Sequence, residues 1–234
     1  MLFCKPLASL VLAYVAGISS AGSDAASLKF SPKEGVSTSY SIDASLTINA
    51  SPATMTSKMV EKIVKVDQDG TYSVQTDTDP GKIVYDGNSI DAPKSSSITV
   101  YKPNGEIVSM TGDYSDASSL RSLDLTILLR PDMPVNIGDK WEENLKTDPK
   151  TGAVAVHGTY TLDGEEKIGT HDAWRVVGSL REVEGTDPGS NEFTYWVSKE
   201  DGSVLKCSSK YSNVVFPGGQ GPLSGTITYT RVDG

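Results

Sequence analysis

The stretch Tyr40-Ser-Ile-Asp-Ala-Ser-Leu-Thr-Ile48 decides the fold class of this chain. Its apolar residues occupy every second position, so all five point to one face of an extended strand. A helix would not gather these residues on one side, because its side chains repeat every 3.6 residues. The stretch therefore predicts a β-strand with one buried face and one face in water.

The same alternation of apolar and polar residues recurs along most of the chain, at residues 62–66, 71–76, 98–101, 106–110, 154–162, 173–180, 192–197, 203–208 and 226–232. The pairs between these segments are Asp69-Gly70, Asp86-Gly87, Asn104-Gly105, Asp163-Gly164 and Asp201-Gly202. Asn-Gly and Asp-Gly tolerate the positive φ angles of tight hairpins, so consecutive strands are expected to be antiparallel neighbours. The predicted fold is mainly β, a curved antiparallel sheet or an incomplete β-barrel.

One segment departs from this alternation. Leu120, Leu123 and Ile127 recur at helical spacing, and Pro131 ends the pattern. We predict one covering α-helix over residues 116–129, because a helix with a single apolar stripe needs a surface to cover and the concave face of a curved sheet supplies one.

The chain also contains a weak internal repeat. Residues 98–110 align with residues 195–207 at an offset of 97. This predicts two related half-sheets, residues 28–112 and 135–212, within a single β-rich domain over residues 28–232. Chance similarity of β-hairpins is the alternative, since hairpin signals look alike.

The first 21 residues have the pattern of a secretory signal peptide. Lys5 precedes an apolar run of about ten residues, and small residues follow up to Ala21. Cleavage after Ala21 or as late as Ala25 fits the small-x-small rule. The run is shorter than the roughly 20 residues that a membrane helix needs. We therefore expect a secreted or periplasmic protein with no stable membrane span after cleavage.

Composition excludes several classes of protein. The 234 residues include 21 Lys plus Arg against 30 Asp plus Glu, a net charge of −9, which argues against nucleic acid as a partner. Two cysteines and two histidines are too few for a zinc ribbon or a His-built metal centre. We predict no metal and no cofactor, and we interpret Cys207 as a small buried hydrophobe on a strand.

The sequence indicates no catalytic residues. Neither His157 nor His171 is accompanied by a nucleophile motif. Most carboxylates fall in turns, where Asp hydrogen-bonds the backbone. We expect a protein without enzymatic activity, although a two-carboxylate glycosidase stays open because it requires only two acids across a cleft.

Aromatic residues give the strongest hint of a binding site. Tyr195 and Trp196 are adjacent on one strand and therefore point to opposite faces. One faces the core. The other either is covered by the helix or a neighbouring strand, or presents an apolar surface to a sugar ring, a lipid chain or a protein partner. With the helix stripe, the candidate ligand-binding residues are Trp196, Tyr195, Leu120, Leu123 and Ile127.

Three motifs carry a resemblance to known proteins. The P-V-x-x-G-D-x-W turn at 134–141, the Y-x-x-x-G strand at 160–164 and the Y-W-x-x-x-x-D-G-x-V hairpin at 195–204 resemble an uncharacterised family of secreted bacterial β-proteins. The likeness covers residues 28–212. More distantly, a curved sheet crossed by a helix is similar to the lipoprotein-carrier (LolA-like) fold. That resemblance implies an apolar groove between sheet and helix, and no binding residue transfers.

These patterns lead to one main hypothesis. We expect a secreted or periplasmic, non-enzymatic β-protein that binds an apolar or amphipathic ligand or an envelope partner. A carbohydrate-binding or carbohydrate-active β-protein is the rival from a different class, and a purely structural surface protein is the third reading.

Overall fold

The computed structural model describes residues 25–48, 51–148, 153–185, 187–215 and 221–232. The predicted signal peptide, residues 1–21, lies outside the described residues. No helix among those that the structure describes is long and apolar enough to cross a membrane.

The described chain is built almost entirely of strands. They are β1 (Ser37–Ile48), β2 (Ser51–Val66), β3 (Tyr72–Thr78), β4 (Lys82–Tyr85), β5 (Asn88–Asp91), β6 (Ser95–Tyr101), β7 (Ile107–Gly112), β8 (Lys140–Leu145), β9 (Val156–Ile168), β10 (His171–Glu182), β11 (Ser190–Ser198), β12 (Val204–Val214) and β13 (Leu223–Val232). A single α-helix, α1 (Ala117–Asp124), interrupts the series in the described part of the chain. The prediction of a mainly β protein is confirmed.

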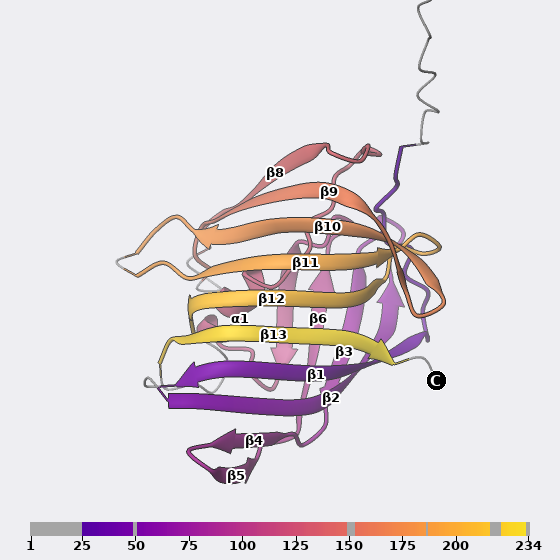
Figure 1. Ribbon diagram of the computed structural model, residues 1–234. Helices are drawn as coiled ribbons and strands as arrows, with labels where there is room; N and C mark the ends of the chain where they lie inside the picture. The colour runs from indigo at the N-terminus through magenta and orange to yellow at the C-terminus, as the bar shows by residue number, and fades with distance from the viewer. Residues whose placement is uncertain (1–24, 49–50, 149–152, 186, 216–220, 233–234) are drawn as a thin grey trace, which may run out of the picture.

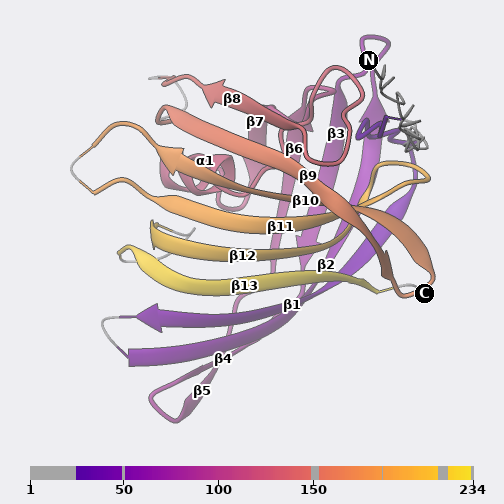
Figure 2. The same cartoon turned by 45° about the horizontal axis from the view of Figure 1, so that its top comes forward.

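The strands form one antiparallel sheet in the order β7-β6-β3-β2-β1-β13-β12-β11-β10-β9-β8, with the β4–β5 hairpin attached to β2. The sheet does not close, because β7 and β8 are not paired with each other in the described residues. Figure 1 shows how strongly it bends: β3 and β6 pass behind β12, β13 and β1 at a steep angle. The bend creates a concave side, and α1 lies on that side (Figure 2).

Two halves of the sheet share one topology. The order β7-β6-β3-β2-β1 in the first half corresponds to β12-β11-β10-β9-β8 in the second, and β13 lies between β1 and β12. The same backbone bonds occur at the start of each half: the Gly35 amide donates to Ile63 at 2.8 Å, and the Gly138 amide donates to Leu162 at 2.7 Å. The weak sequence repeat thus coincides with two half-sheets of the same strand order.

The two halves also exchange contacts. Arg130, which precedes β8, donates its amide to Asn104 in the β6–β7 turn at 2.8 Å, and Ser31, which precedes β1, donates to Asp201 in the β11–β12 turn at 2.9 Å. The glycine that follows each turn residue has a positive φ, and a Cβ there would lie 2.6 Å or less from a backbone oxygen of the other half. Each half therefore locks its entry segment onto a hairpin of its partner.

Four of the five predicted turns lie between strands, and one prediction is wrong. Asp163-Gly164 lies inside β9, where Asp163 is the extra residue of a bulge opposite Arg175 and Val176 of β10, and the chain turns later, at Gly169. Asp163 instead forms an ion pair with Arg175, with 2.5 Å between the carboxylate and the guanidinium. An Asp-Gly pair therefore also fits a bulged strand.

The second half-sheet carries a dry core on its concave side. Leu162, Val176, Leu180 and Val197 are fully buried there. Tyr160 stacks on Trp141 with ring centroids 5.3 Å apart, and tyrosine and tryptophan rings fill such space efficiently.

The helix is shorter than predicted. It ends at Asp124, not at residue 129, and residues 125–130 continue as an irregular segment across the concave side, here named the crossing segment. Leu125, Ile127, Leu128 and Leu129 are all buried. Because these apolar side chains are buried on every side of the backbone, they do not form the one-sided stripe that a covering helix needs.

Side chains of the sheet satisfy the backbone of the crossing segment. Asn191 donates to the Leu125 carbonyl at 2.8 Å, Trp141 donates through its indole to Leu129 at 3.0 Å, and the Tyr195 hydroxyl donates to Thr126. Buried carbonyls without partners are costly, so these bonds make an irregular buried segment possible.

A buried ion pair holds α1 against the second half-sheet. Arg121 on α1 donates two hydrogen bonds to the carboxylate of Glu182 on β10, one of them at 2.6 Å, and the Gly189 amide donates a third at 2.7 Å. Burial raises the pKa of Glu182, but these hydrogen bonds outweigh burial and hold it below its ordinary value. The Glu182 side chain is 0% exposed, so Arg121 is required to offset its charge.

We predict that Arg121→Met destabilises the protein by about 3 kcal/mol, because it leaves the Glu182 carboxylate buried without a counter-ion. Urea denaturation at pH 7 measures the change. The double variant Arg121→Met with Glu182→Leu is expected to recover most of the loss.

The matched control is Lys82→Met, which breaks the exposed Lys82–Asp91 pair and should cost no more than about 1 kcal/mol. Equal losses in Arg121→Met and Lys82→Met would contradict the role given to the buried pair.

Candidate functional site

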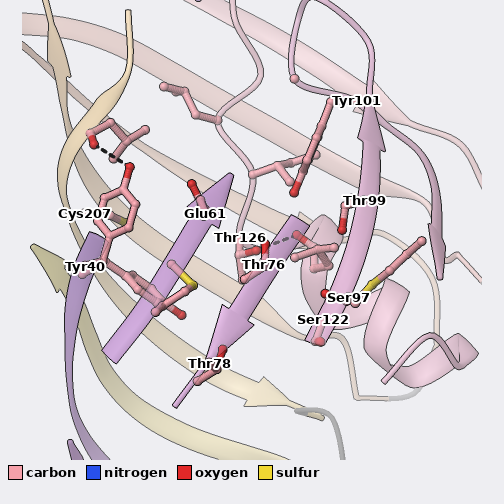
Figure 3. A pocket seen from close by; sticks show the side chains of 18 of the residues that line it. Tyr40, Glu61, Thr76, Thr78, Ser97, Thr99, Tyr101, Ser122, Thr126 and Cys207 are labelled. Atoms are coloured by element: carbon pink, nitrogen blue, oxygen red, sulfur yellow. Dashed lines mark hydrogen bonds between the residues drawn. The ribbon is translucent and has the colours of Figure 1, made fainter. Parts of the chain in front are cut away.

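A cavity of about 410 Å³ lies between the first half-sheet, α1 and the crossing segment. Strands β1, β2, β3 and β6 of the first half-sheet form much of its wall, residues of β11, β12 and β13 add to it, and Ser119, Leu123 and Ile127 line it from α1 and the crossing segment. Figure 3 shows side chains from β2, β3 and β6, among them Glu61, Thr76 and Tyr101, around the space. A second cavity of about 270 Å³ adjoins it and shares Tyr40, Glu61 and Arg130 in its wall.

Hydroxyl groups line the floor of the larger cavity in rows across the sheet. Thr76 on β3 is paired with Glu61 on β2 and with Ser97 on β6. The next row repeats the pattern, with Thr78 on β3 between Met59 and Ser95. The inward face of the first half is therefore polar where the inward face of the second half is apolar.

Strand β6 shows most clearly that polar side chains face the cavity and apolar ones face outward. Ser97, Thr99 and Tyr101 line the cavity, whereas Ile98, the apolar residue between them, points outward and is 40% exposed. An ordinary half-buried strand would turn Ile98 inward and the hydroxyls toward water. The structure reverses this order, so the hydroxyls of β6 line the cavity although they contribute little to a packed apolar core.

Tyrosine is the most frequent residue in the wall. Seven of the ten tyrosines in the chain line the larger cavity, and they are Tyr40, Tyr72, Tyr101, Tyr114, Tyr195, Tyr211 and Tyr229. Tyr72 and Tyr101 stack with centroids 5.3 Å apart. Such rings offer apolar faces together with hydroxyl groups, which suits ligands of mixed character.

Glu61 is the acidic group at the centre of the wall. It lines both cavities, and Figure 3 shows it rising from β2 between Tyr40 and Tyr101. Burial alone raises its pKa to about 7, with no hydrogen bond or charge from a described residue acting in the other direction. A carboxyl group that faces a cavity without a partner is unusual, because burial of an unpaired charge is costly.

Arg130 is the basic group of the same wall. It is 7% exposed, donates to the Leu28 carbonyl at 2.6 Å and lies 5.6 Å from the centre of the Phe30 ring. Burial lowers the pKa of its guanidinium, which nevertheless stays charged at neutral pH. It forms no ion pair within 4 Å in the part of the chain that the structure describes, and it ties the crossing segment to the entry segment of β1.

Three of the five residues predicted from the sequence come together in this wall: Tyr195, Leu123 and Ile127. Leu120 is buried on α1 but does not line the cavity. Trp196 lies on the outer face, where its indole donates to Glu166 at 2.7 Å and Lys206 sits 4.8 Å from its ring.

The other residues singled out in the sequence play structural parts. His157 contacts Asn144 at 2.9 Å at an exposed position. Cys207 is buried in the cavity wall, and burial raises the pKa of its thiol to about 11, so it remains protonated. Among the described residues, no cluster of His, Cys, Asp and Glu has the arrangement of a metal site.

Glu61, Arg130 and the hydroxyl rows were not predicted from the sequence as residues of the site. Thr76 and Thr78 on β3 and Ser97 and Thr99 on β6 alternate at a period of two, as apolar core residues do. That alternation of hydroxyls was the available signal. Glu61 gave none, because it lies in a strand where charged and apolar residues alternate.

Comparisons with known proteins add little. No family model matches the chain, and no curated protein matches it. Among solved structures, the chain is similar to a DUF1329 family protein from Desulfovibrio piger ATCC 29098, with 11% identity over 84% of each chain and a TM-score of 0.24. A likeness this weak assigns neither a family nor an activity.

The raised pKa of Glu61 predicts a pH dependence of stability. Between the ordinary value of 4.5 and about 7, the folded protein binds a proton that the unfolded chain has released, so stability falls as pH rises through this window. Glu61→Gln removes this contribution. We predict that the variant loses less stability than the wild type between pH 5 and pH 8, as measured by urea denaturation at each pH.

Asp124, whose pKa burial also raises to about 7, titrates in the same window but is present in both proteins and cancels in the comparison. Parallel pH profiles for the two proteins would show that the Glu61 carboxyl is not shielded from water.

Proposed function

We propose that this chain is a non-enzymatic binding protein that holds a small amphipathic ligand in the cavity of its first half-sheet. One observation carries the proposal: two half-sheets of the same strand order differ in what covers them. Tyr160, Phe193 and Leu129 fill the concave side of the second half, whereas the first half lines a cavity of about 410 Å³. Packed cores contain few voids of that size.

The wall supports a ligand with both polar and apolar parts. Ile42, Met59, Met110 and Leu123 supply apolar surface, and methionine adapts to irregular shapes. The hydroxyls of Thr78 and Thr99 lie beside Met59 and Met110, their cross-strand neighbours in the same sheet. Ser119 on α1 adds a buried hydroxyl for which the described residues offer no hydrogen-bond partner. A ligand group that bonds to Ser119 would satisfy this oxygen.

We also propose that the protein acts outside the cytoplasm. The pattern of residues 1–21 supports secretion or a periplasmic location, and a carrier of an amphipathic ligand suits that compartment. The resemblance of three sequence motifs to secreted bacterial β-proteins agrees with this proposal.

The test is binding of the neutral dye 1-N-phenylnaphthylamine to the native protein, followed by fluorescence. Saturable binding is expected. We predict that Ser97→Phe weakens it at least about tenfold, because a ring placed on the cavity floor occupies the ligand's space. Thermal unfolding of the variant checks that it remains folded.

The matched control is Ser109→Phe, which adds the same ring to an exposed position on the neighbouring strand β7. It should leave dye binding unchanged. Absence of saturable binding, or equal loss in the two variants, would remove the proposed function.

A further inference from the structure

We infer that the ligand carries an organic ammonium group, which binds the Glu61 carboxylate within a cage of tyrosine rings. The inference rests on the proposed function and names the chemistry of the ligand at the same site. It starts from the group that the fold leaves unexplained: Glu61 faces both cavities and has no hydrogen-bond or ion-pair partner among the described residues. Folding gains nothing visible from a carboxyl group placed there.

Tyrosines from four strands surround this carboxyl group. Tyr40, Tyr72 and Tyr101 line both cavities together with Glu61. Burial raises the pKa of these three tyrosines and of Tyr229, and the charge of Glu61 raises each of them further. All four line the larger cavity. They come from β1, β3, β6 and β13, so the cage is assembled by the bend of the sheet.

Rings of this kind and a carboxylate form a site for a cation. The faces of tyrosine rings attract ammonium groups, and the attraction is stronger where water is excluded. The Tyr40 hydroxyl donates a hydrogen bond to the Val204 carbonyl at 3.0 Å, and the Tyr72 ring stacks on the Tyr101 ring. These contacts fix the rings in place before a ligand arrives, which lowers the cost of binding.

Arg130 does not act as the cation that pairs with Glu61 in the free protein. No hydrogen bond or ion pair within 4 Å joins Arg130 to Glu61 among the described residues, and burial alone sets the shift in the pKa of Glu61. Its guanidinium is also engaged with Leu28 and Phe30. Glu61 therefore keeps its charge available for a ligand.

Binding of an ammonium ion requires Glu61 to be ionised. The titratable and charged groups that share its cavities are Tyr40, Tyr72, Tyr101, Tyr114, Tyr195, Tyr211, Tyr229, Cys207, Asp113, Arg130, Lys33 and Asp201. Burial raises the pKa of Tyr40, Tyr72, Tyr101, Tyr195, Tyr211, Tyr229 and Cys207, away from neutral pH, and hydrogen bonds outweigh burial to hold the pKa of Asp201 below its ordinary value. Because a proton must leave Glu61, affinity for the cation should fall about tenfold per pH unit below about 7.

The experiment compares hexyltrimethylammonium, hexanesulfonate and 1-hexanol by isothermal titration calorimetry at pH 8 and pH 5. These probes share one apolar chain and differ in head-group charge. We predict that wild-type protein binds the ammonium probe at least about tenfold more tightly than the other two at pH 8, and loses this preference at pH 5. Glu61→Gln should abolish both the preference and its pH dependence while leaving binding of 1-hexanol unchanged.

A second variant tests the aromatic cage. Tyr101→Leu should weaken the ammonium probe and retain its pH dependence, whereas Tyr101→Phe, which keeps the ring, should bind as the wild type does. Retained pH dependence in Tyr101→Leu also shows that the site has folded.

The outcomes separate the two proposals. Equal binding of the three probes, tighter binding of hexanesulfonate, or full affinity for the ammonium probe in Glu61→Gln would overturn the inference and leave the proposed function standing. If neither the probes nor the neutral dye binds, both are overturned.

Discussion

The structure depends on satisfying the backbone of one irregular segment buried inside a bent sheet. The amides of Leu125, Thr126 and Arg130 bond to backbone carbonyls, but the carbonyls of Leu125, Thr126 and Leu129 accept from side chains. Asn191, Trp141 and Tyr195 supply these donors from the second half-sheet, and the ion pair between Arg121 and Glu182 holds the preceding helix on the same side. The segment is thereby fixed over one half of the molecule, and the other half is left hollow.

This asymmetry gives two half-sheets of the same strand order different tasks. The second half packs tyrosine, phenylalanine and leucine against the crossing segment and supplies most of the dry core. The first half turns hydroxyls, tyrosines and Glu61 inward, a face that by itself packs poorly and that tolerates water or a ligand. If the proposed function holds, stability and binding are carried largely by different strands, and a polar cavity wall does not have to hold the fold together.

Local sequence patterns predicted the sheet but only part of the site. The alternation at residues 40–48 and the Asn-Gly and Asp-Gly turns were sufficient for the antiparallel strands. The helix was predicted to end five residues beyond its last residue, Asp124, since periodicity cannot distinguish a one-sided stripe from a segment buried all round. Tyr195, Leu123 and Ile127 were found because they are apolar or aromatic. Glu61 and Arg130 were not, because they line the same cavities only where the sheet bends, and that long-range placement has no local signature.

The most direct test of the account is a crystal structure of the protein grown with 6-bromohexyltrimethylammonium, in which anomalous scattering locates the bromine. The account predicts one bromine peak between the floor of β2, β3 and β6 and the crossing segment, with the head group beside Glu61. A cavity without bromine, or a peak confined to the outer face around Trp196, would contradict it.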